Sequence, residues 1–158
     1  MAKRRAFAAA LVALTLPAAA TDPVFGTWTW VPDGDAGSAT DKCYVTSMED
    51  LGNGKFRETS TRVRANGKVV KQDTVSAFDG FDHPSGLGNG MTAAFNRIDQ
   101  NRYAITLKKD GKSLATVMRT VSADGNGMTQ VVNGNADGKP FSEIQMFARK
   151  DGSCEGTP

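Results

Sequence analysis

The chain has 158 residues with 19 Lys or Arg and 17 Asp or Glu, so its formal net charge is only +2. Such a balance gives no electrostatic basis for binding nucleic acid or an anionic membrane surface. The longest apolar stretch, residues 6–16, is too short to span a bilayer as a helix. We therefore expect a globular protein that does not span a membrane and does not bind nucleic acid.

The first twenty residues have the pattern of a secretory signal peptide. Three basic residues at positions 3–5 precede the apolar run at 6–16, and Pro17 is followed by three alanines. Small residues at this point suit signal peptidase. We expect cleavage near Ala20, a periplasmic or secreted location, and a single mature domain, residues 21–158. Without the three basic residues of the signal, 16 basic residues face 17 acidic ones, so the mature domain is close to neutral.

Both cysteines, Cys43 and Cys154, lie in the predicted mature domain. In an oxidising compartment, two cysteines without a Cys-x-x-Cys spacing most simply form one disulfide. Closing a loop of about 110 residues would contribute about 4 to 5 kcal/mol through chain entropy. Two reactive free thiols are the alternative, but neither residue has a histidine or a helix start nearby to activate it.

Asn-Gly and Asp-Gly pairs recur about every thirteen residues between Asn53 and Gly152, with one long gap. Asn, Asp and Gly tolerate the positive φ that tight hairpin turns require. The spacing equals one strand plus one turn, and the segments between the turns differ from one another in sequence. The rhythm therefore predicts an antiparallel up-and-down meander rather than a stacked repeat.

The intervals between these turns predict nine strands. In chain order they are Val24–Val31, Asp41–Asp50, Lys55–Arg64, Lys68–Phe78, Met91–Ile98, Arg102–Lys109, Lys112–Val121, Met128–Gly134 and Phe141–Lys150. Antiparallel strands joined by hairpins usually close into a barrel, because closure removes exposed sheet edges. The predicted fold class is all-β, an up-and-down meander that forms a barrel of about 8–9 strands.

The predicted strands differ in their apolar content. Tyr103, Ile105 and Leu107 share one face of a later strand and indicate a core. The strands Lys55–Arg64 and Lys68–Phe78, in contrast, hold few apolar side chains on either face and could not line a dry core. They form either a solvated margin of the sheet or the lining of a cavity that holds water or a polar ligand.

Several short motifs carry a family resemblance. Gly26-Thr27-Trp28 matches the G-x-W signature of lipocalins, and stretches such as Phe78–Pro84 and Arg119–Gly125 are similar to a group of exported bacterial lipocalin-like proteins. The resemblance covers most of the mature domain and implies a lipocalin-like barrel. In lipocalins the Trp closes one barrel end and an Arg of the last strand packs on it, so the resemblance implies these parts for Trp28 and Arg149. It carries over no catalytic residue.

A barrel cavity would be lined by apolar side chains and a few polar groups that orient the ligand. The ligand-binding candidates are Trp28, Trp30, Arg62, Phe78, Phe95, Met118 and Arg119. The two tryptophans could instead belong to the core at the barrel end. Arg62 and Arg64 share a face with Glu58 and Ser60, and an outward, solvated orientation is the default expectation for such a face.

His83 is the only histidine and hence the only ready general base near neutral pH. It lies with Asp79 and Asp82 in a glycine-rich stretch, Asp79–Gly90, which is predicted as a loop. These three side chains could form an acid–base or metal site, or the aspartates could simply cap their own turns. A zinc site needs more ligands, and no nucleophile, phosphate-loop or dinucleotide motif is present. We therefore expect no enzyme activity, no metal and no cofactor.

The sequence thus predicts a periplasmic or secreted barrel that binds a small apolar or amphipathic ligand. The alternative is a structural barrel whose interior is filled by its own side chains and whose loops bind a protein partner. The stretch Asp79–Gly90 is where we expect such a contact. The volume and the lining of the barrel interior discriminate between the two hypotheses.

Overall fold

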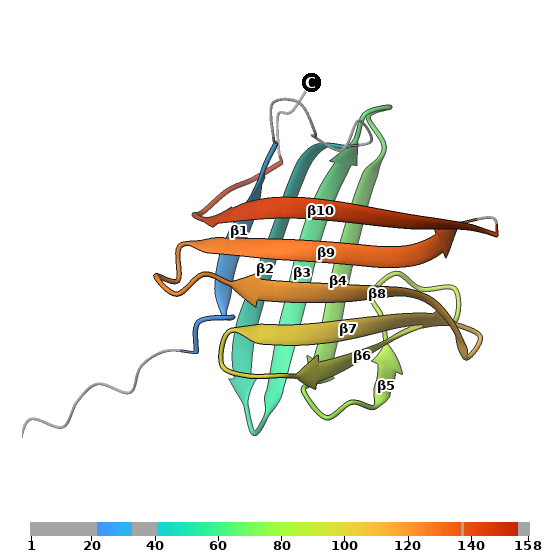
Figure 1. Cartoon of the computed structure of the whole chain (residues 1–158), viewed down its shortest axis with the longest axis horizontal. Helices are drawn as coiled ribbons and strands as arrows, with labels where there is room; N and C mark the ends of the chain where they lie inside the picture. The colour runs from blue at the N-terminus through green and yellow to red at the C-terminus, as the bar shows by residue number, and fades with distance from the viewer. Residues whose placement is uncertain (1–21, 33–40, 137, 155–158) are drawn as a thin grey trace, which may run out of the picture.

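In the computed structural model, residues 22–32, 41–136 and 138–154 are described. They form one antiparallel sheet of ten strands (Figure 1): β1 Gly26–Val31, β2 Asp41–Gly52, β3 Lys55–Arg64, β4 Val69–Ala77, β5 Asp82–Pro84, β6 Met91–Arg97, β7 Arg102–Lys109, β8 Lys112–Val121, β9 Gly127–Ala136 and β10 Lys139–Arg149. The predicted signal peptide lies outside the described residues. Across the described ranges, no helix has the length and hydropathy that a membrane crossing requires.

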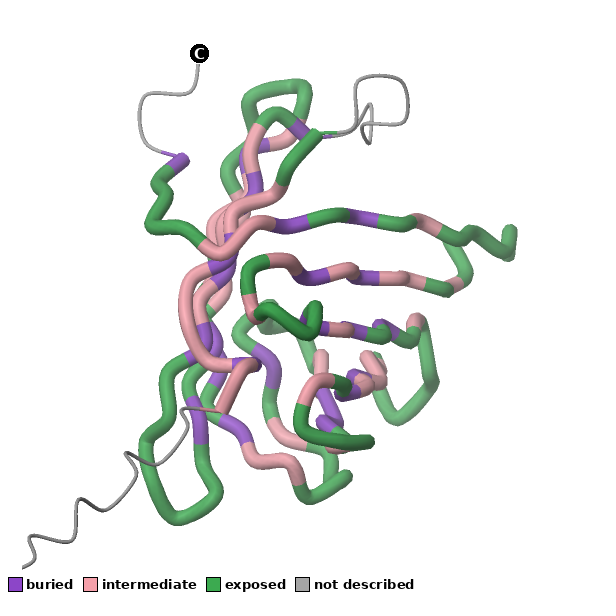
Figure 2. The backbone as a smooth tube through the Cα atoms, turned by 60° about the vertical axis from the view of Figure 1, so that its left-hand side comes forward, coloured by how far each residue is buried: buried purple, intermediate pink, exposed green. Residues whose placement is uncertain are grey.

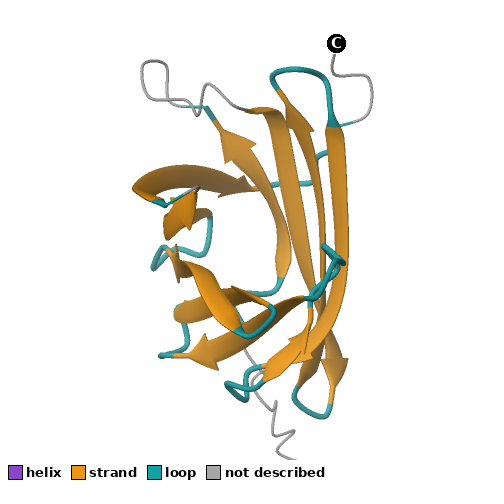
Figure 3. Cartoon of the chain, turned by 90° about the vertical axis from the view of Figure 1, so that its right-hand side faces the viewer, coloured by secondary structure: helices purple, strands orange, loops and turns teal. Residues whose placement is uncertain are grey.

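The sheet curls into a nearly closed barrel (Figure 3). Strands adjacent in sequence pair with each other except β4 and β5, and β1 pairs with β10, which joins the two ends of the chain. The order is therefore β4-β3-β2-β1-β10-β9-β8-β7-β6-β5, and the two edge strands β4 and β5 approach each other without pairing. The predicted antiparallel meander that closes into a barrel is confirmed.

Three of the Asn/Asp-Gly pairs have the positive φ at both residues that was expected of them, and two of these three join consecutive paired strands. Asn53 and Gly54 between β2 and β3, and Asp110 and Gly111 between β7 and β8, all have φ between 50° and 76°. A type I′ turn needs positive φ at both central residues, and its twist matches that of the flanking strands. These pairs therefore end one strand and begin the next with no longer loop between them.

The structure contains one strand that the sequence analysis missed. β5 lies inside the stretch predicted as a loop, and its His83 is opposite Ala93 of β6. A strand of three residues is too short to show alternation, and it ends on Pro84, which usually argues against a strand. A proline is tolerated here because β5 is an edge strand, where one side of the backbone needs no partner.

An aromatic core fills one end of the barrel. Phe56 of β3 lies 4.6 Å from Phe78 and 4.9 Å from Phe95, measured between ring centroids. Tyr103 packs against Phe78 at 5.4 Å. Such pairs contribute about 0.5 to 1.5 kcal/mol each beyond their buried area. Buried and exposed positions alternate along the strands that surround this core (Figure 2).

Trp28 is buried at the same end of the barrel, and Arg149 of β10 covers it. The guanidinium carbon of Arg149 lies 4.2 Å from the centroid of the Trp28 ring. Arg149 also donates hydrogen bonds to the backbone oxygens of Phe25 and Gly125. A Cβ on Gly26 would lie 2.3 Å from Nη1 of Arg149, and the φ of Gly26 is +129°. The backbone conformation therefore favours glycine at this position of the G-x-W motif, and a Cβ here would also displace the guanidinium of Arg149.

A disulfide joins Cys43 in β2 to Cys154, which follows β10. The bond spans a sequence separation of 111 residues and fastens the C-terminal segment to an early strand. A disulfide between these residues was predicted from the sequence, and its presence is compatible with an oxidising compartment.

The seam between β4 and β5 is held by the turn that follows β5. The amide of Gly86 donates a hydrogen bond of 2.9 Å to Oγ1 of Thr74, which is buried in β4. A Cβ on Gly86 would lie only 2.2 Å from the backbone oxygen of Asp73. The turn can therefore approach β4 this closely only because residue 86 has no side chain.

Replacing Gly86 with alanine is expected to lower the free energy of unfolding by about 2 kcal/mol, because the backbone of Asp73 must move away. Urea denaturation would measure the loss, and hydrogen exchange would show faster opening of the seam. Gly127→Ala is the matched control, since its Cβ would meet no atom closer than 3.4 Å and its φ is not positive. Equal stability of the two variants would contradict this account of the seam.

Candidate ligand-binding site

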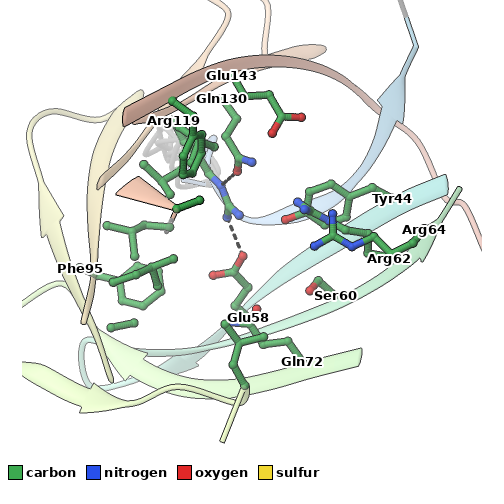
Figure 4. Close-up of a pocket in the computed structure, with 18 residues that line it drawn as sticks. Tyr44, Glu58, Ser60, Arg62, Arg64, Gln72, Phe95, Arg119, Gln130 and Glu143 are labelled. Atoms are coloured by element: carbon green, nitrogen blue, oxygen red, sulfur yellow. Dashed lines mark hydrogen bonds and ion pairs between the residues drawn. The ribbon is translucent and has the colours of Figure 1, made fainter. Parts of the chain in front are cut away.

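Beyond the aromatic core, the described residues leave a cavity of about 540 Å³ inside the barrel (Figure 4). This volume is within the usual range of small-molecule sites. The lining is polar on the side of β2 to β4 and mainly apolar on the side of β6 to β9, where Arg119 of β8 and Gln130 of β9 are the polar exceptions; β10 contributes one side chain of each kind. The apolar side chains are Leu87, Ala93, Phe95, Ile105, Leu107, Val117, Val132, Ala136 and Phe141, and the polar ones are Tyr44, Glu58, Ser60, Arg62, Arg64, Gln72, Arg119, Gln130 and Glu143.

The alternation of β3 explains why so many polar groups face the interior. Phe56 is fully buried in the core, and every second residue after it points to the same side of the strand. Glu58, Ser60, Arg62 and Arg64 therefore follow Phe56 inward and line the cavity in that order. A slip of one residue would expose Phe56, so the core sets the register of the polar lining.

A buried ion pair lies at the centre of the lining. Nη1 of Arg119 is 2.6 Å from Oε1 of Glu58, and the two side chains are 5% and 4% exposed. Nη1 also donates to the Tyr103 hydroxyl at 2.9 Å, and Nε donates to Gln130 at 2.6 Å. Burial by itself would lower the pKa of Arg119, but the carboxylate of Glu58 together with Tyr103 and Tyr44 outweighs burial and holds this pKa well above its ordinary value. Arg119 is therefore charged, and its charge is balanced inside the barrel.

The ion pair belongs to a hydrogen-bond network that crosses the barrel. Thr46 donates to Oε1 of Glu58, and the Tyr103 hydroxyl donates to the sulfur of Met48 at 3.0 Å. Burial raises the pKa of Tyr103, so its hydroxyl stays protonated. On the other side of Arg119, Nε2 of Gln130 donates to Gln145, and Gln145 donates to Glu143. These bonds orient the polar groups before any ligand arrives.

One nitrogen and one oxygen of the ion pair remain available to a ligand. Among the described residues, none forms a hydrogen bond with Nη2 of Arg119 or with Oε2 of Glu58. Both side chains line the cavity. The pair therefore presents one donor group and one acceptor atom to whatever occupies the interior.

A second polar cluster lies further along β3 and consists of Asp41, Arg62 and Arg64. Nη1 of Arg64 is 3.0 Å from Oδ1 of Asp41, and Nε of Arg62 is 3.5 Å from Oδ2. The Asp41 side chain is 1% exposed, whereas those of Arg62 and Arg64 are 22% and 38% exposed. Arg62 also stacks on the Tyr44 ring at 4.1 Å. The expectation that Arg62 and Arg64 face outward is wrong, because Asp41 and Tyr44 hold them at the cavity.

The structure brings three of the seven sequence-predicted ligand-binding residues to the cavity, namely Arg62, Phe95 and Arg119. Trp28 is buried under Arg149, and Phe78 and Trp30 pack against the core as partly buried side chains; none of these three lines the cavity. Met118 lies on the outer face with 37% of its surface exposed.

The prediction that Met118 lines the cavity is therefore corrected. In β8, Val117, Arg119 and Val121 are buried, so the intervening residue Met118 points outward. A cavity role for both Met118 and Arg119 was inconsistent with a strand, because adjacent residues face opposite sides.

The sequence analysis missed the partners that hold Arg119. Gln130 lies directly opposite Arg119 in the pairing of β8 with β9, and Gln145 lies opposite Gln130 in the pairing of β9 with β10. Their alignment follows from the register of three strands. Glu58 was the one partner with a visible signal, since it shares a face with Arg62 at strand spacing.

His83 does not line the cavity. Its Nε2 is 3.0 Å from both carboxylate oxygens of Asp79. The amide of Phe81 and the His83 ring lower the pKa of Asp79. Asp82 turns away and pairs with Lys108. Within the described ranges no group of three acidic, His or Cys side chains could hold a metal ion, so the three residues do not assemble one site.

Comparison with known proteins shows which fold this chain resembles. No protein-family model and no curated protein match this sequence. A point mutant of the fluorescent protein UnaG is similar with a TM-score of 0.57 and 15% identity, over 82% of this chain and 98% of that chain. Wild-type UnaG has a TM-score of 0.54 and 17% identity, over 80% and 96% of the two chains. At these identities the likeness shows the fold alone, a small antiparallel β-barrel.

Proposed function

We propose that this protein is an exported lipocalin-like barrel that binds one small amphipathic molecule in its cavity. The observation that carries the proposal is the mixed lining of the 540 Å³ interior, which combines an apolar wall with a pre-oriented polar network that crosses the barrel. The signal-like residues 1–20 and the disulfide between Cys43 and Cys154 support export. The G-x-W start at Gly26 supports the family assignment.

The lining suits an amphipathic molecule better than a wholly apolar or wholly polar one. Each methylene group of a ligand that moves from water to the wall formed by Phe95, Leu107 and Val117 contributes about 0.8 kcal/mol. Arg119 and Glu58 are buried and have little access to water. A ligand that forms hydrogen bonds with Nη2 of Arg119 and Oε2 of Glu58 is therefore favoured over one that cannot. The filled, structural barrel is less favoured, because the described side chains leave the interior open.

Replacing Val132 with Trp should block binding, because an indole at this position occupies the cavity. The probe is 11-(dansylamino)undecanoic acid, whose fluorescence reports an apolar environment, and we expect its affinity to fall at least about tenfold. Val131→Trp is the matched control, because Val131 faces outward on the same strand, opposite Met118 and Ile144. Circular dichroism would establish that both variants fold.

If the Val132→Trp variant binds the probe as tightly as the parent protein, the cavity is not the binding site. Native mass spectrometry of protein purified from its host provides a second readout. A bound mass that is retained in the Val131 variant and missing from the Val132 variant would support the proposal directly.

A further inference from the structure

The cavity contains two clusters of polar side chains, and these clusters differ in net charge. Arg119 and Glu58 form a neutral pair deep in the barrel. The second cluster holds two guanidinium groups, Arg62 and Arg64, against the single carboxylate of Asp41. Its net charge is therefore +1. The remaining carboxylate of the lining, Glu143, accepts a hydrogen bond from Gln145 and forms no ion pair within the described part of the chain.

The deep pair is poorly suited to a charged ligand group. Arg119 and Glu58 are both nearly inaccessible to water. An anion placed beside them would leave one buried negative charge in excess, and an uncompensated buried charge is strongly unfavourable. A carbonyl, hydroxyl or amide group could instead accept from Nη2 of Arg119 or donate to Oε2 of Glu58 without changing the net charge.

The second cluster, formed by Asp41, Arg62 and Arg64, is in contrast well suited to an anionic group of a ligand. Within the described residues, Asp41 engages only Nε of Arg62 and Nη1 of Arg64, so further N–H groups of both guanidinium groups remain for a ligand. Arginine N–H groups match the geometry of a carboxylate or a phosphate. Both arginines are partly exposed, so a ligand anion here keeps part of its hydration. Tyr44 fixes the plane of Arg62 and reduces the entropy lost on binding.

The spacing of the two groups follows from β3 itself. Glu58 and Arg62 face the same side of this strand and lie four residues apart, which corresponds to about 13 Å at the usual rise per residue. Phe95 of the apolar wall lies across the cavity from Arg62 and Arg64 (Figure 4), and the other apolar side chains of the wall line the same cavity. An elongated molecule can therefore reach both groups while its body packs on the wall.

We propose that the ligand is an elongated organic anion, held by its anionic group at Arg62 and Arg64 and by an uncharged polar group at Arg119 and Glu58. This inference rests on the proposed function and adds the charge and the orientation of the ligand. Arg119 then serves as a hydrogen-bond donor to the ligand, and the partly exposed Arg62 and Arg64 select a ligand with a negative charge.

The test compares 11-(dansylamino)undecanoic acid with its methyl ester, which differ only in the anionic group. The parent protein is expected to bind the acid about tenfold more tightly than the ester. Asp41→Asn raises the charge of the cluster to +2, so the acid should bind still more tightly while the affinity of the ester stays unchanged. Adding Arg62→Gln and Arg64→Gln to Asp41→Asn makes the cluster neutral without leaving a buried carboxylate unpaired, and the preference for the acid should disappear.

Arg57→Gln is the matched control, since Arg57 lies on the outward face of the same strand, paired with Asp73, and should leave the ratio of the two affinities unchanged. A preference for the acid that survives in the triple variant, or that weakens in Asp41→Asn, overturns the inference. Equal binding of acid and ester by the parent protein also overturns it but leaves the proposed function standing. If neither probe binds the folded parent protein, the proposed function fails as well.

Discussion

Replacing Arg119 with Met is expected to lower the free energy of unfolding by about 3 to 5 kcal/mol, because it leaves the carboxylate of Glu58 buried without its cation. Glu58 is 4% exposed at its side chain and would keep only the hydroxyl of Thr46 as a described hydrogen-bond partner. Gln130 and Tyr103 would lose the donor that they now share. Urea denaturation followed by circular dichroism measures the loss.

A second variant separates the charge from the packing. Adding Glu58→Gln to Arg119→Met removes the orphaned charge and keeps a side chain of similar size that Thr46 can contact. This double variant should recover a large part of the stability, since a neutral pair replaces a buried ion pair at small cost. Arg57→Met, which breaks the exposed pair with Asp73, should cost less than about 1 kcal/mol. If the single and double variants are equally unstable, the lost packing of Arg119 explains the effect and its charge does not.

Removing the disulfide should produce the other large loss of stability. Replacing both Cys43 and Cys154 with serine is expected to lower the free energy of unfolding by about 4 to 5 kcal/mol, because a loop of this length strongly restricts the unfolded chain. In the folded state the bond also attaches the segment after β10 to β2. Urea denaturation with and without a reducing agent would measure the effect.

The serine variant also supplies the control for this experiment. A reducing agent should destabilise the parent protein to about the level of the variant and should leave the variant itself unchanged. If reduction does not move the unfolding midpoint of the parent protein, the disulfide contributes nothing to stability. Binding of the dansyl probe should be retained at low temperature in both cases, because neither cysteine lines the cavity.

The positions of the hairpins were largely predictable because they depend on local chemistry. The tight turns at Asn53-Gly54 and Asp110-Gly111 need positive φ at both central residues, and few residues other than Asn, Asp and Gly adopt it at low cost. β5 escaped prediction because its three residues owe their strand conformation to pairing with β6, which is not a local property. The same holds for the contact of Gly86 with β4.

The faces of the later strands were less predictable than their bounds. In β10 the apolar Ile144 is 65% exposed, whereas the polar Gln145 is 2% exposed. An apolar residue normally marks the buried face, so hydrophobicity favoured the wrong side at this point. Phe147 at the core end of the strand decides the orientation, and Gln145 is then turned inward, where Gln130 satisfies its oxygen.

By itself the sequence determined the meander, the turns and the polar character of β3, because each depends on residue type at a local spacing, and it determined the single disulfide because two cysteines allow only one pairing. The tertiary structure alone decided that the polar face of β3 points inward, that Arg119 meets Glu58, and that Arg62 and Arg64 share Asp41. These contacts join strands far apart in the chain, and they exist only once the registers of the sheet are set. The free-energy cost of burying Arg119 is offset by partners on strands across the barrel. No local sequence pattern indicates which residues those partners are.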